Sequence, residues 1–404
     1  MSTTLFNIET VKAELSNIAN WWLENTIDHQ DGGFLGEIDH LGNVVADANK
    51  GIILNSRILW FFSELAIVSK EQKHIDAAIR AFHYLIDHFD DKTYGGSLWE
   101  LSSKGSLINA KKQTYAQCFC IYAYAAYHKL TGSELAIEKA FEYFELVEKY
   151  ARDPINGGYV EALTQQWGAI DDYRLSDKDM NLPKSMNTHL HVLEAYAALH
   201  HVKPTEKTQE ALRHVIDVFT CHIIDNESNH LKLFFDMQWH DKSTFYSFGH
   251  DIEASWLLWE ALEILANKEY LVKFRPVVIA LAETCLNEAI GDQGQVCDEF
   301  EFNNQQRHQV SYWWVQAEAL VGFLNAYQMT GQQKYAQVCS GIWQFIDDYH
   351  LDKKMGEWHW VSTNDQPEYL PEYKVGFWKA PYHNGRAMME LSKLFQRIAL
   401  YKVS

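Results

Sequence analysis

The stretch Asp31-Gly32-Gly33-Phe34 is the first copy of a turn signal that recurs along the chain. The clear repeats are Tyr94-Gly95-Gly96-Ser97 and Asn156-Gly157-Gly158-Tyr159, and weaker echoes are Asn229-His230-Leu231, Asp292-Gln293-Gly294-Gln295 and Met355-Gly356-Glu357-Trp358. A spacing of about sixty residues is too long for common solenoid repeats but fits two helices and a loop. The recurrence therefore predicts six helical hairpins. We expect the glycine turns to close the hairpins at one end, and the longer loops to shape a pocket at the other.

Apolar residues between these turns recur with helical spacing. They predict helices at residues 11–24, 52–68, 74–89, 113–130, 134–150, 186–201, 209–224, 252–266, 276–289, 313–329, 334–349 and 381–398. Many of these segments are apolar on more than one face, as helices packed in two layers must be. We therefore expect an all-α (α/α)6 barrel of about twelve helices in two concentric layers, forming one catalytic domain over residues 1–404.

An open α-solenoid that binds other proteins is the alternative architecture. Solenoids usually end in polar capping repeats. Here the final segment, residues 377–386, is aromatic and rich in side chains that can do chemistry, which favours a closed barrel.

Composition narrows the functional classes. Hydrophobic residues make up 47 % of the 404, enough for a large core, and the formal net charge is −19. An acidic chain repels nucleic acid and strongly anionic substrates, whereas a neutral sugar is indifferent to the charge. The six cysteines form no Cys-x-x-Cys pair, residues 1–8 show no charged region followed by an apolar run, and the sequence contains no uninterrupted run of 18 apolar residues. We expect a cytoplasmic protein with reduced thiols, monomeric or homodimeric, that binds neither nucleic acid nor membrane.

The first of four candidate clusters is Ser185-Met186-Asn187-Thr188-His189-Leu190-His191. Asn187 and His191 are four residues apart and share a helix face. His189 and His191 are two apart, so on a helix they diverge and cannot chelate one ion. No His-Glu-x-x-His motif or Cys/His ligand spacing occurs elsewhere, and we therefore expect no metal.

The second cluster is Ser247-Phe248-Gly249-His250-Asp251-Ile252-Glu253. Gly249 marks a helix boundary, and His250 and Glu253 share a face. A helix N-terminus lowers the pKa of a histidine and a nearby carboxylate raises it. The balance can leave the pKa of His250 near neutrality, where acid–base catalysis is most effective.

The third cluster is Phe377-Trp378-Lys379-Ala380-Pro381-Tyr382-His383-Asn384-Gly385-Arg386, in which Pro381 suits a first helical turn and places His383 there as well. The fourth, Tyr312-Trp313-Trp314-Val315-Gln316-Ala317-Glu318, also opens a helix. Most of the 19 histidines must be ordinary, and tryptophan pairs usually serve packing. The shared placement at helix starts in different hairpins favours a common site.

The sequence lacks the motifs of several other enzyme classes. The chain has no Gly-x-Gly-x-x-Gly, P-loop or Gly-x-Ser-x-Gly, which argues against nucleotide cofactors, phosphoryl transfer and serine hydrolysis. Barrels of this class also serve as glycosidases, and inverting glycosidases need two carboxylates about 6.5–9.5 Å apart. The clusters here contain histidines with only single acids nearby, so we do not expect a glycosidase.

At these clusters the chain resembles the N-acylglucosamine 2-epimerase superfamily, and most closely its cellobiose 2-epimerases. The resemblance extends over essentially the whole chain and is carried by Ile53-Leu54-Asn55-Ser56-Arg57-Ile58-Leu59-Trp60, Tyr115-Ala116-Gln117 and residues 185–196, 247–258, 313–328 and 377–386. It implies an (α/α)6 barrel that inverts C2 of the reducing-end glucose of a neutral β-1,4-linked disaccharide such as cellobiose, without metal or cofactor.

The resemblance also implies the site. His250 and His383 are expected to be the acid–base pair that flanks C2, and His191 to assist at O1 or in ring opening. Arg57 is expected to contact the C1 and C2 oxygens. The remaining implied pocket residues are the polar Tyr115, Asp179, Asn187 and Glu253 and the aromatic platforms Trp314 and Trp378.

The implied chemistry is physically coherent. Removing the C2 proton beside an open-chain aldehyde gives a cis-enediolate, which must be reprotonated from the opposite face; two bases on opposite sides are therefore needed. Arg57 can stabilise the developing oxyanion, and no redox cofactor is required. Alternatives left open are an N-acylglucosamine 2-epimerase, a mannose or glucose aldose–ketose isomerase, and a carbohydrate-binding protein without activity.

Overall fold

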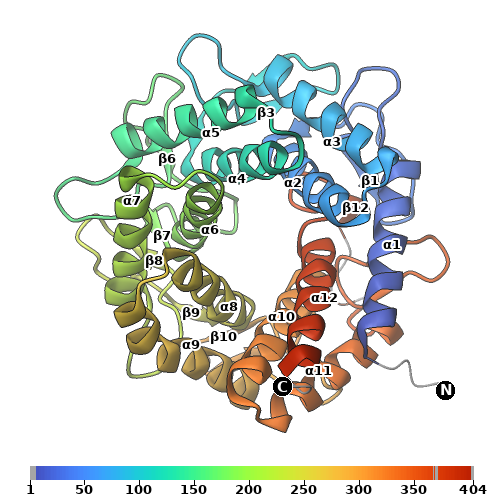
Figure 1. The fold of residues 1–404 in the computed structure, drawn as a ribbon, viewed down its shortest axis with the longest axis vertical. Helices are drawn as coiled ribbons and strands as arrows, with labels where there is room; N and C mark the ends of the chain where they lie inside the picture. Colours follow the sequence, from blue (N-terminus) through green and yellow to red (C-terminus); the bar gives the residue numbers. More distant parts are fainter. Residues whose placement is uncertain (1–5, 367, 369–371, 402–404) are drawn as a thin grey trace.

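The computed structural model describes residues 6–366, 368 and 372–401, and its helices form two concentric rings (Figure 1). The inner ring consists of α2 (Ile52–Ser69), α4 (Thr114–Thr131), α6 (Met186–Val202), α8 (Phe248–Leu265), α10 (Trp313–Thr330) and α12 (His383–Tyr401). The outer ring consists of α1 (Ile8–Asn25), α3 (Gln72–Tyr84), α5 (Glu134–Leu146), α7 (Glu206–Val218), α9 (Lys268–Glu288) and α11 (Gln333–Phe345). Consecutive inner helices contact one another and α12 contacts α2, so the ring is closed. The predicted (α/α)6 barrel is confirmed.

Inner helices pack on outer helices across short connections. Four of these connections turn through a single left-handed residue: Lys70, Gly132, Ala266 and Gly331. The helix α2 is, among the described residues, the one long and apolar enough to cross a membrane, but 78 % of it is buried inside the barrel. Its apolar character therefore serves the packing between the two rings.

The glycine turns do not lie where we expected them. They occur in the long connections that lead from an outer helix to the next inner helix, and not in the short connections that close each hairpin. Four outer helices end in a π-helical turn, after which the chain must reverse: η1 (Leu85–Phe89), η2 (Val147–Ala151), η3 (Phe219–Ile223) and η4 (Ile346–His350). Gly95 and Gly96, with φ of 73° and 72°, supply this reversal after η1. The expectation was wrong because a glycine pair signals a reversal without showing which helices flank it.

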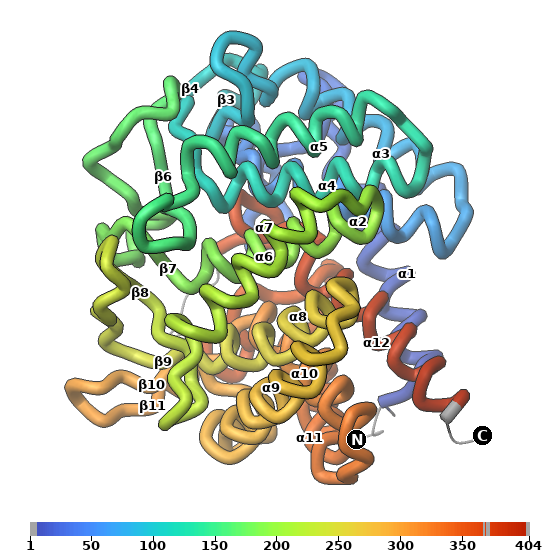
Figure 2. Tube along the Cα trace, turned by 60° about the vertical axis from the view of Figure 1, so that its left-hand side comes forward, coloured from blue at the N-terminus to red at the C-terminus, as the bar shows by residue number. Residues whose placement is uncertain are grey.

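Short strands complete the long connections. They are β1 (Ile38–Asp39), β2 (Lys50–Gly51), β3 (Glu100–Leu101), β4 (Leu107–Asn109), β5 (Lys112–Gln113), β6 (Ala162–Leu163), β7 (Lys184–Ser185), β8 (Phe234–Phe235), β9 (Phe245–Ser247), β10 (Glu299–Glu301), β11 (Gln306–His308) and β12 (Tyr373–Val375). They pair as β1–β12, β2–β3–β4, β5–β6, β7–β8 and β9–β10–β11, all antiparallel. Figure 2 shows most of them at one end of the barrel, where β2, β5, β7 and β9 lead directly into inner helices.

Six of the helix starts differ from the prediction by two residues or more, among them those of α8, α9 and α12. The helix α9 begins at Lys268, where the Asn267 side chain caps it, so Pro276 lies inside the helix and does not open it. The helix α8 begins at Phe248, which places His250 within its first turn. The helix α12 begins at His383, just after Pro381, because the ordered turn before it is not helical.

Buried lysines attach the glycine turns to the inner helices. Four buried lysines each pair with an aspartate at the start of a turn; three of them lie two residues before an inner helix, and the fourth lies on β12, nine residues before α12. The pairs are Lys50–Asp28 (2.6 Å), Lys112–Asp91 (2.8 Å), Lys184–Asp153 (2.7 Å) and Lys374–Asp352 (2.8 Å). Each of these ammonium groups also donates to a backbone carbonyl of the turn, at Gly32, Ser97, Gly157 or Gly356. Charge-assisted bonds thus attach the starts of α2, α4 and α6, and the strand β12, to the preceding turns.

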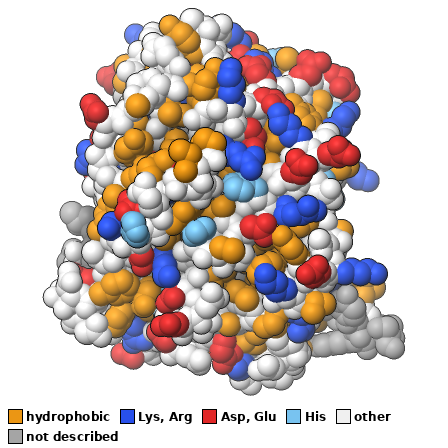
Figure 3. All heavy atoms as spheres, turned by 90° about the vertical axis from the view of Figure 1, so that its left-hand side faces the viewer, with side chains coloured by type: hydrophobic (Ala, Val, Ile, Leu, Met, Phe, Trp, Pro, Cys, Tyr) orange, Lys and Arg blue, Asp and Glu red, His pale blue; other side chains and the backbone are white. Residues whose placement is uncertain are grey.

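The negative charge is not gathered into one patch on the face shown in Figure 3. Acidic and basic side chains are interspersed there among apolar ones, on the side that carries α7 in Figure 1. A basic stripe of the kind that binds nucleic acid is not visible on this face.

Candidate active site

The predicted site residues lie where the inner helices begin. The helical ones are Arg57 on α2, Tyr115 on α4, Asn187 and His191 on α6, His250 and Glu253 on α8, Trp314 on α10 and His383 on α12. All lie within the first two turns of their helices, and Asp179 and Trp378 lie in the loops before α6 and α12. Because the N-termini of helices carry positive partial charge, this end of the barrel favours a developing anion.

Trp314 lies against both histidines of the expected pair. Its ring centroid is 4.8 Å from that of His250 and 5.7 Å from that of His383. Gly249 permits this approach, since a Cβ atom there would lie 2.5 Å from the Trp314 ring. The structure thus brings two histidines from different hairpins to one indole.

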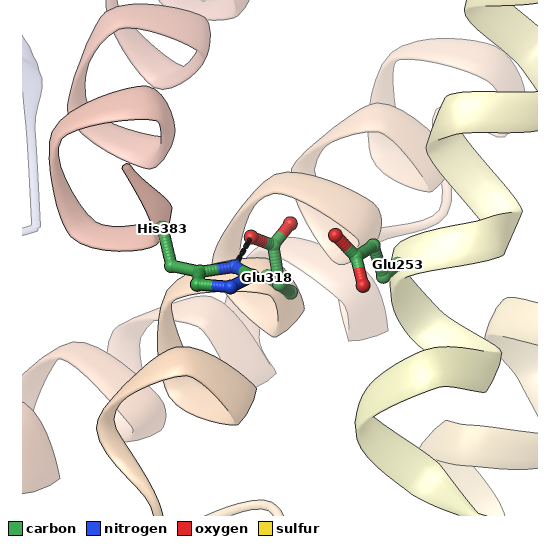
Figure 4. Close-up of side chains that lie close together, drawn as sticks. All are labelled: Glu253, Glu318 and His383. Carbon is green, nitrogen blue, oxygen red and sulfur yellow. Dashed lines mark hydrogen bonds and ion pairs between the residues drawn. The ribbon is translucent and has the colours of Figure 1, made fainter. Parts of the chain in front are cut away.

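Both imidazoles have a fixed partner at Nδ1. The Nδ1 atom of His383 lies 2.7 Å from Oε1 of Glu318 (Figure 4), and that of His250 lies 2.7 Å from the Ser247 hydroxyl. Burial lowers the pKa of His250 to about 3, helped by the charge of His191. Burial also lowers the pKa of His383 well below its usual value. Both rings are therefore neutral near pH 7 in the free protein. The expected balance that would leave the pKa of His250 near neutrality is not found, because burial dominates and Glu253 is bonded to Arg386.

His191 and Arg57 lie beside this pair. The Nδ1 atom of His191 lies 2.9 Å from Oε2 of Glu194, and its ring packs 4.8 Å from that of Tyr115. Arg57 donates to the Tyr115 hydroxyl at 2.9 Å and to the Trp378 carbonyl at 2.7 Å. Its Nε–H is buried and has no partner among the described residues. Arg57 is thus held rigidly, with a donor left over.

Arg386 is the centre of a carboxylate cluster that was not predicted. Its Nη2 atom donates to Oε1 of Glu253 at 2.6 Å and to Oε1 of Glu318 at 2.7 Å, and its Nη1 atom donates to Glu194. Burial, with the charge of Glu318 next, raises the pKa of Glu253 to about 7.

Three inner helices share a pattern that could have revealed this cluster. Each carries a site histidine followed three residues later by a charged residue, in His191-x-x-Glu194, His250-x-x-Glu253 and His383-x-x-Arg386. Residues three apart lie on one helix face. We had used this spacing only for His250 and Glu253.

Our expectation of single acids near the histidines was therefore wrong, because three buried carboxylates converge. Glu253, Glu318 and His383 even place one donor atom each within 4.8 Å of one another, as a metal site would (Figure 4). Arg386, however, bridges the two carboxylates as their counter-cation. Within this cluster of described residues, Glu253 and Glu318 are thus not a free carboxylate pair of the kind that glycoside hydrolysis needs, and an arginine stands where a metal ion could bind.

Asp179 and Asn187 line a cavity together with His250. The Oδ2 atom of Asp179 accepts bonds from the backbone N–H and hydroxyl of Ser176, at 2.7 and 2.9 Å, so it also holds its own loop. The Oδ1 atom of Asn187 is buried without a partner among the described residues. The ring of Trp378 lies 6.3 Å from that of Tyr115. All ten predicted residues thus lie in or beside one region of the barrel.

Known proteins are similar to this chain in both sequence and fold. Residues 33–384 match the sequence profile of the N-acylglucosamine 2-epimerase (GlcNAc 2-epimerase) family. The chain is 39 % identical to a cellobiose 2-epimerase of Bacteroides fragilis, over 95 % of this chain and 97 % of the relative, and 34 % identical to one of Ruminococcus albus, over 95 % and 98 %. The solved structure of the cellobiose 2-epimerase of Bacillus thermoamylovorans superposes with a TM-score of 0.91 at 32 % identity, covering 96 % of this chain and 98 % of that one.

The fold and these relatives define a carbohydrate epimerase. The chain belongs to the N-acylglucosamine 2-epimerase family. Within that family it is similar to the cellobiose 2-epimerases along nearly its full length.

Proposed function

We propose that the protein inverts C2 of the reducing-end glucose of a β-1,4-linked disaccharide such as cellobiose, giving the mannose epimer through a cis-enediolate. The observation that carries the proposal is the pair His250 and His383, two neutral imidazoles from different hairpins that both pack against Trp314. The names of the relatives in Bacteroides and Ruminococcus support the choice of cellobiose.

The two histidines act as opposed bases. One neutral histidine accepts the C2 proton from the open-chain aldose. The other must first take up a proton from solvent as an imidazolium, and it then gives that proton to C2 of the enediolate on the opposite face, so that one proton is removed and one is added in each turnover. For His383 the carboxylate of Glu318 stabilises the imidazolium that forms, as an acid partner does in catalytic triads. His250 has only the neutral Ser247 hydroxyl at Nδ1, so the two bases differ in how well they hold a proton.

Arg57 and the helix ends stabilise the negative charge of the enediolate. The unpartnered Nε–H of Arg57 is available to an oxygen at C1 or C2, and the rest of its guanidinium is fixed by Tyr115 and the Trp378 carbonyl. A donor that is already oriented needs no reorganisation when charge develops. His191, held by Glu194, is placed to assist proton transfer at O1 during ring opening.

Incubation with cellobiose in D2O tests the proposal. We expect the mannose epimer as product, with deuterium at C2. A ketose with deuterium at C1 would instead show an aldose–ketose isomerase, and turnover of N-acetylglucosamine but not cellobiose would show an N-acylglucosamine 2-epimerase. Binding without any exchange or product would leave a carbohydrate-binding protein.

A further inference from the structure

Four inner helices are attached to the preceding turn by the same side chain–backbone hydrogen bond, which we call the turn lock. In each, the side chain four residues after the N-cap accepts the backbone N–H that follows the turn. The bonds are Gln117–Ser97 (2.8 Å), His189–Tyr159 (2.9 Å), Asp251–Leu231 (2.8 Å) and Gln316–Val296 (2.9 Å). In α4, α6 and α10 the acceptor is an amide or a neutral histidine, whereas in α8 it is the carboxyl group of Asp251.

His230 lies in the turn that Asp251 holds and is bonded to its carboxyl group. Its carbonyl accepts the N–H of Asp225 at 2.9 Å, which matches the 2.8 Å bonds of Gly96 with Asp91 and of Gly158 with Asp153. A histidine thus occupies a turn position that is glycine in the two clearest repeats. The residue before the α8 N-cap is Tyr246, where α4 and α6 have Lys112 and Lys184.

In this hairpin the turn aspartate Asp225 pairs with Lys232 at 3.6 Å, and a second pair, His230 with Asp251, reaches the inner helix. The Nδ1 atom of His230 lies 2.7 Å from Oδ2 of Asp251, and its Nε2 atom lies 3.2 Å from Glu288 on α9. The imidazole stacks on the Tyr246 ring, with centroids 3.9 Å apart and an interplanar angle of 13°. Both His230 and Asp251 are buried, at 2 % and 0 % exposed.

Asp251 follows His250 directly in the first turn of α8. Successive helical side chains point about 100° apart, so Asp251 reaches outward to His230 while His250 faces Trp314. A rotation or fraying of this turn would move the His250 ring by the same angle. Gly249, which precedes His250 and lies against Trp314, has no side chain that could hold the turn in place.

We propose that His230 is a positioning residue for His250: through its bond to Asp251 it fixes the first turn of α8, and with it the direction from which the His250 imidazole meets C2. The inference rests on the proposed function, because it takes His250 as one of the two bases. The other polar groups that face the couple are Glu288, the Tyr246 phenol and the thiol of Cys285.

The protonation of the couple agrees with this role. Burial lowers the pKa of His230, but the bond to Asp251 and the charges of Asp251 and Glu288 outweigh it and raise the pKa overall. Burial raises the pKa of Asp251, and His230 opposes that rise. His230 and Asp251 are therefore a hydrogen-bonded pair of ionisable groups, whereas the corresponding acceptors on α4, α6 and α10 are two amides and a neutral histidine.

The test is C2 hydrogen exchange in D2O, measured separately from cellobiose and from its mannose epimer. His230→Gln should slow exchange at least tenfold from one epimer, the same one whose exchange His250→Ala abolishes, and less than threefold from the other. Asp251→Asn, which keeps an acceptor for Leu231 but loses the charge, should show the same asymmetry. KM should change less than kcat in both variants.

Gln117→Leu is the matched control, because it breaks the same lock in α4. It should lower the melting temperature without changing the ratio of the two exchange rates. His230→Lys tests rescue, since the lysines that bind three of the other turns already lie over aromatic rings, those of Tyr84, Trp167 and Trp239; it should restore part of the slowed exchange.

Equal slowing from both epimers, or rates within twofold of the wild type, in folded His230→Gln and Asp251→Asn would overturn the inference while leaving the proposed function intact. Absence of exchange in the wild type would instead overturn the proposed function, and the inference with it.

Discussion

The Oε1 atom of Glu318 lies 2.7 Å from Nδ1 of His383, and both groups are buried. A carboxylate can only accept, so this contact places the proton of the neutral imidazole on Nδ1 and leaves Nε2 as the basic atom. The same oxygen accepts a bond from Arg386. The tautomer and orientation of His383 are therefore set by groups on α10 and α12 before any substrate binds.

Trp314 and Trp378 are predicted to stack on sugar rings. Replacing either with Ala should lower kcat/KM by the equivalent of about 1–3 kcal/mol, as loss of an aromatic contact at a binding centre does. Steady-state kinetics with cellobiose measures this. The control is Trp21→Ala, which should leave kcat/KM unchanged. Trp21 lies on the outer helix α1, where its indole N–H donates to the Met355 carbonyl. Unaltered kinetics in a folded Trp314→Ala variant would return that residue to a packing role.

Activity is predicted to be independent of metal ions. Glu253, Glu318 and His383 form the one group of potential ligands that the described residues bring close together, and Arg386 already bridges its two carboxylates. Dialysis against a strong chelator should leave kcat and the melting temperature unchanged. Loss of activity that returns on adding a divalent ion would contradict this.

Much of the fold is visible in the sequence, because helical periodicity and turn residues are local. The twelve helices could be predicted, but the position of the glycine turns in the long connections could not, since a turn signal does not identify its neighbours. The α9 start was missed because the cap at Asn267 outweighs the helix-breaking tendency of Pro276.

The site was only partly predictable for a different reason. Residues such as His250 and His383 stand in recognisable motifs. Glu194 could have been noticed from its spacing to His191, but the bonds that Glu194 and Glu318 make with Arg386 join residues 192 and 68 positions apart along the chain. Pairing over such distances is set by closure of the barrel, which no local pattern records.

Breaking a buried lysine pair should be costly. Lys184→Met leaves Asp153 buried without its cation and should lower the free energy of unfolding by about 3–5 kcal/mol. The double variant Lys184→Met/Asp153→Asn should recover part of this loss. Lys73→Met, at an exposed pair with Glu71, is the control and should cost less than about 1 kcal/mol. Denaturant unfolding measures all three, and equal losses at Lys184 and Lys73 would refute the role of the buried pairs.

Stability should fall in acid partly because of His189. Burial lowers the pKa of His189 to about 3, whereas an unfolded histidine titrates near 6.5. Between these values the unfolded chain binds a proton that the folded chain does not, so stability is lost as the pH falls from about 6.5 towards 3. Glutamine serves the same lock at Gln117, so His189→Gln should fold and should show a shallower loss.

The quantity to measure is the difference in melting temperature between the wild type and His189→Gln at several pH values. Burial raises the pKa of Glu161 and Glu253 to about 7, which acts in the opposite direction in both proteins and cancels in the difference. Parallel curves for wild type and variant across this range would show that His189 does not contribute.

The decisive prediction concerns His250 and His383. A single base could invert C2 only if the enediolate rotated within the site, whereas two bases each serve one face. Either histidine changed to Ala or Asn should therefore remove nearly all epimerisation in both directions. The variant that keeps the glucose-side base should still exchange the C2 hydrogen of cellobiose with solvent, without forming the mannose epimer, and the other variant should do so only from the mannose epimer. Exchange measured in D2O for each variant with each sugar decides between the mechanisms: if one histidine is dispensable and the other carries exchange from both sugars, a single base with rotation of the intermediate replaces the pair.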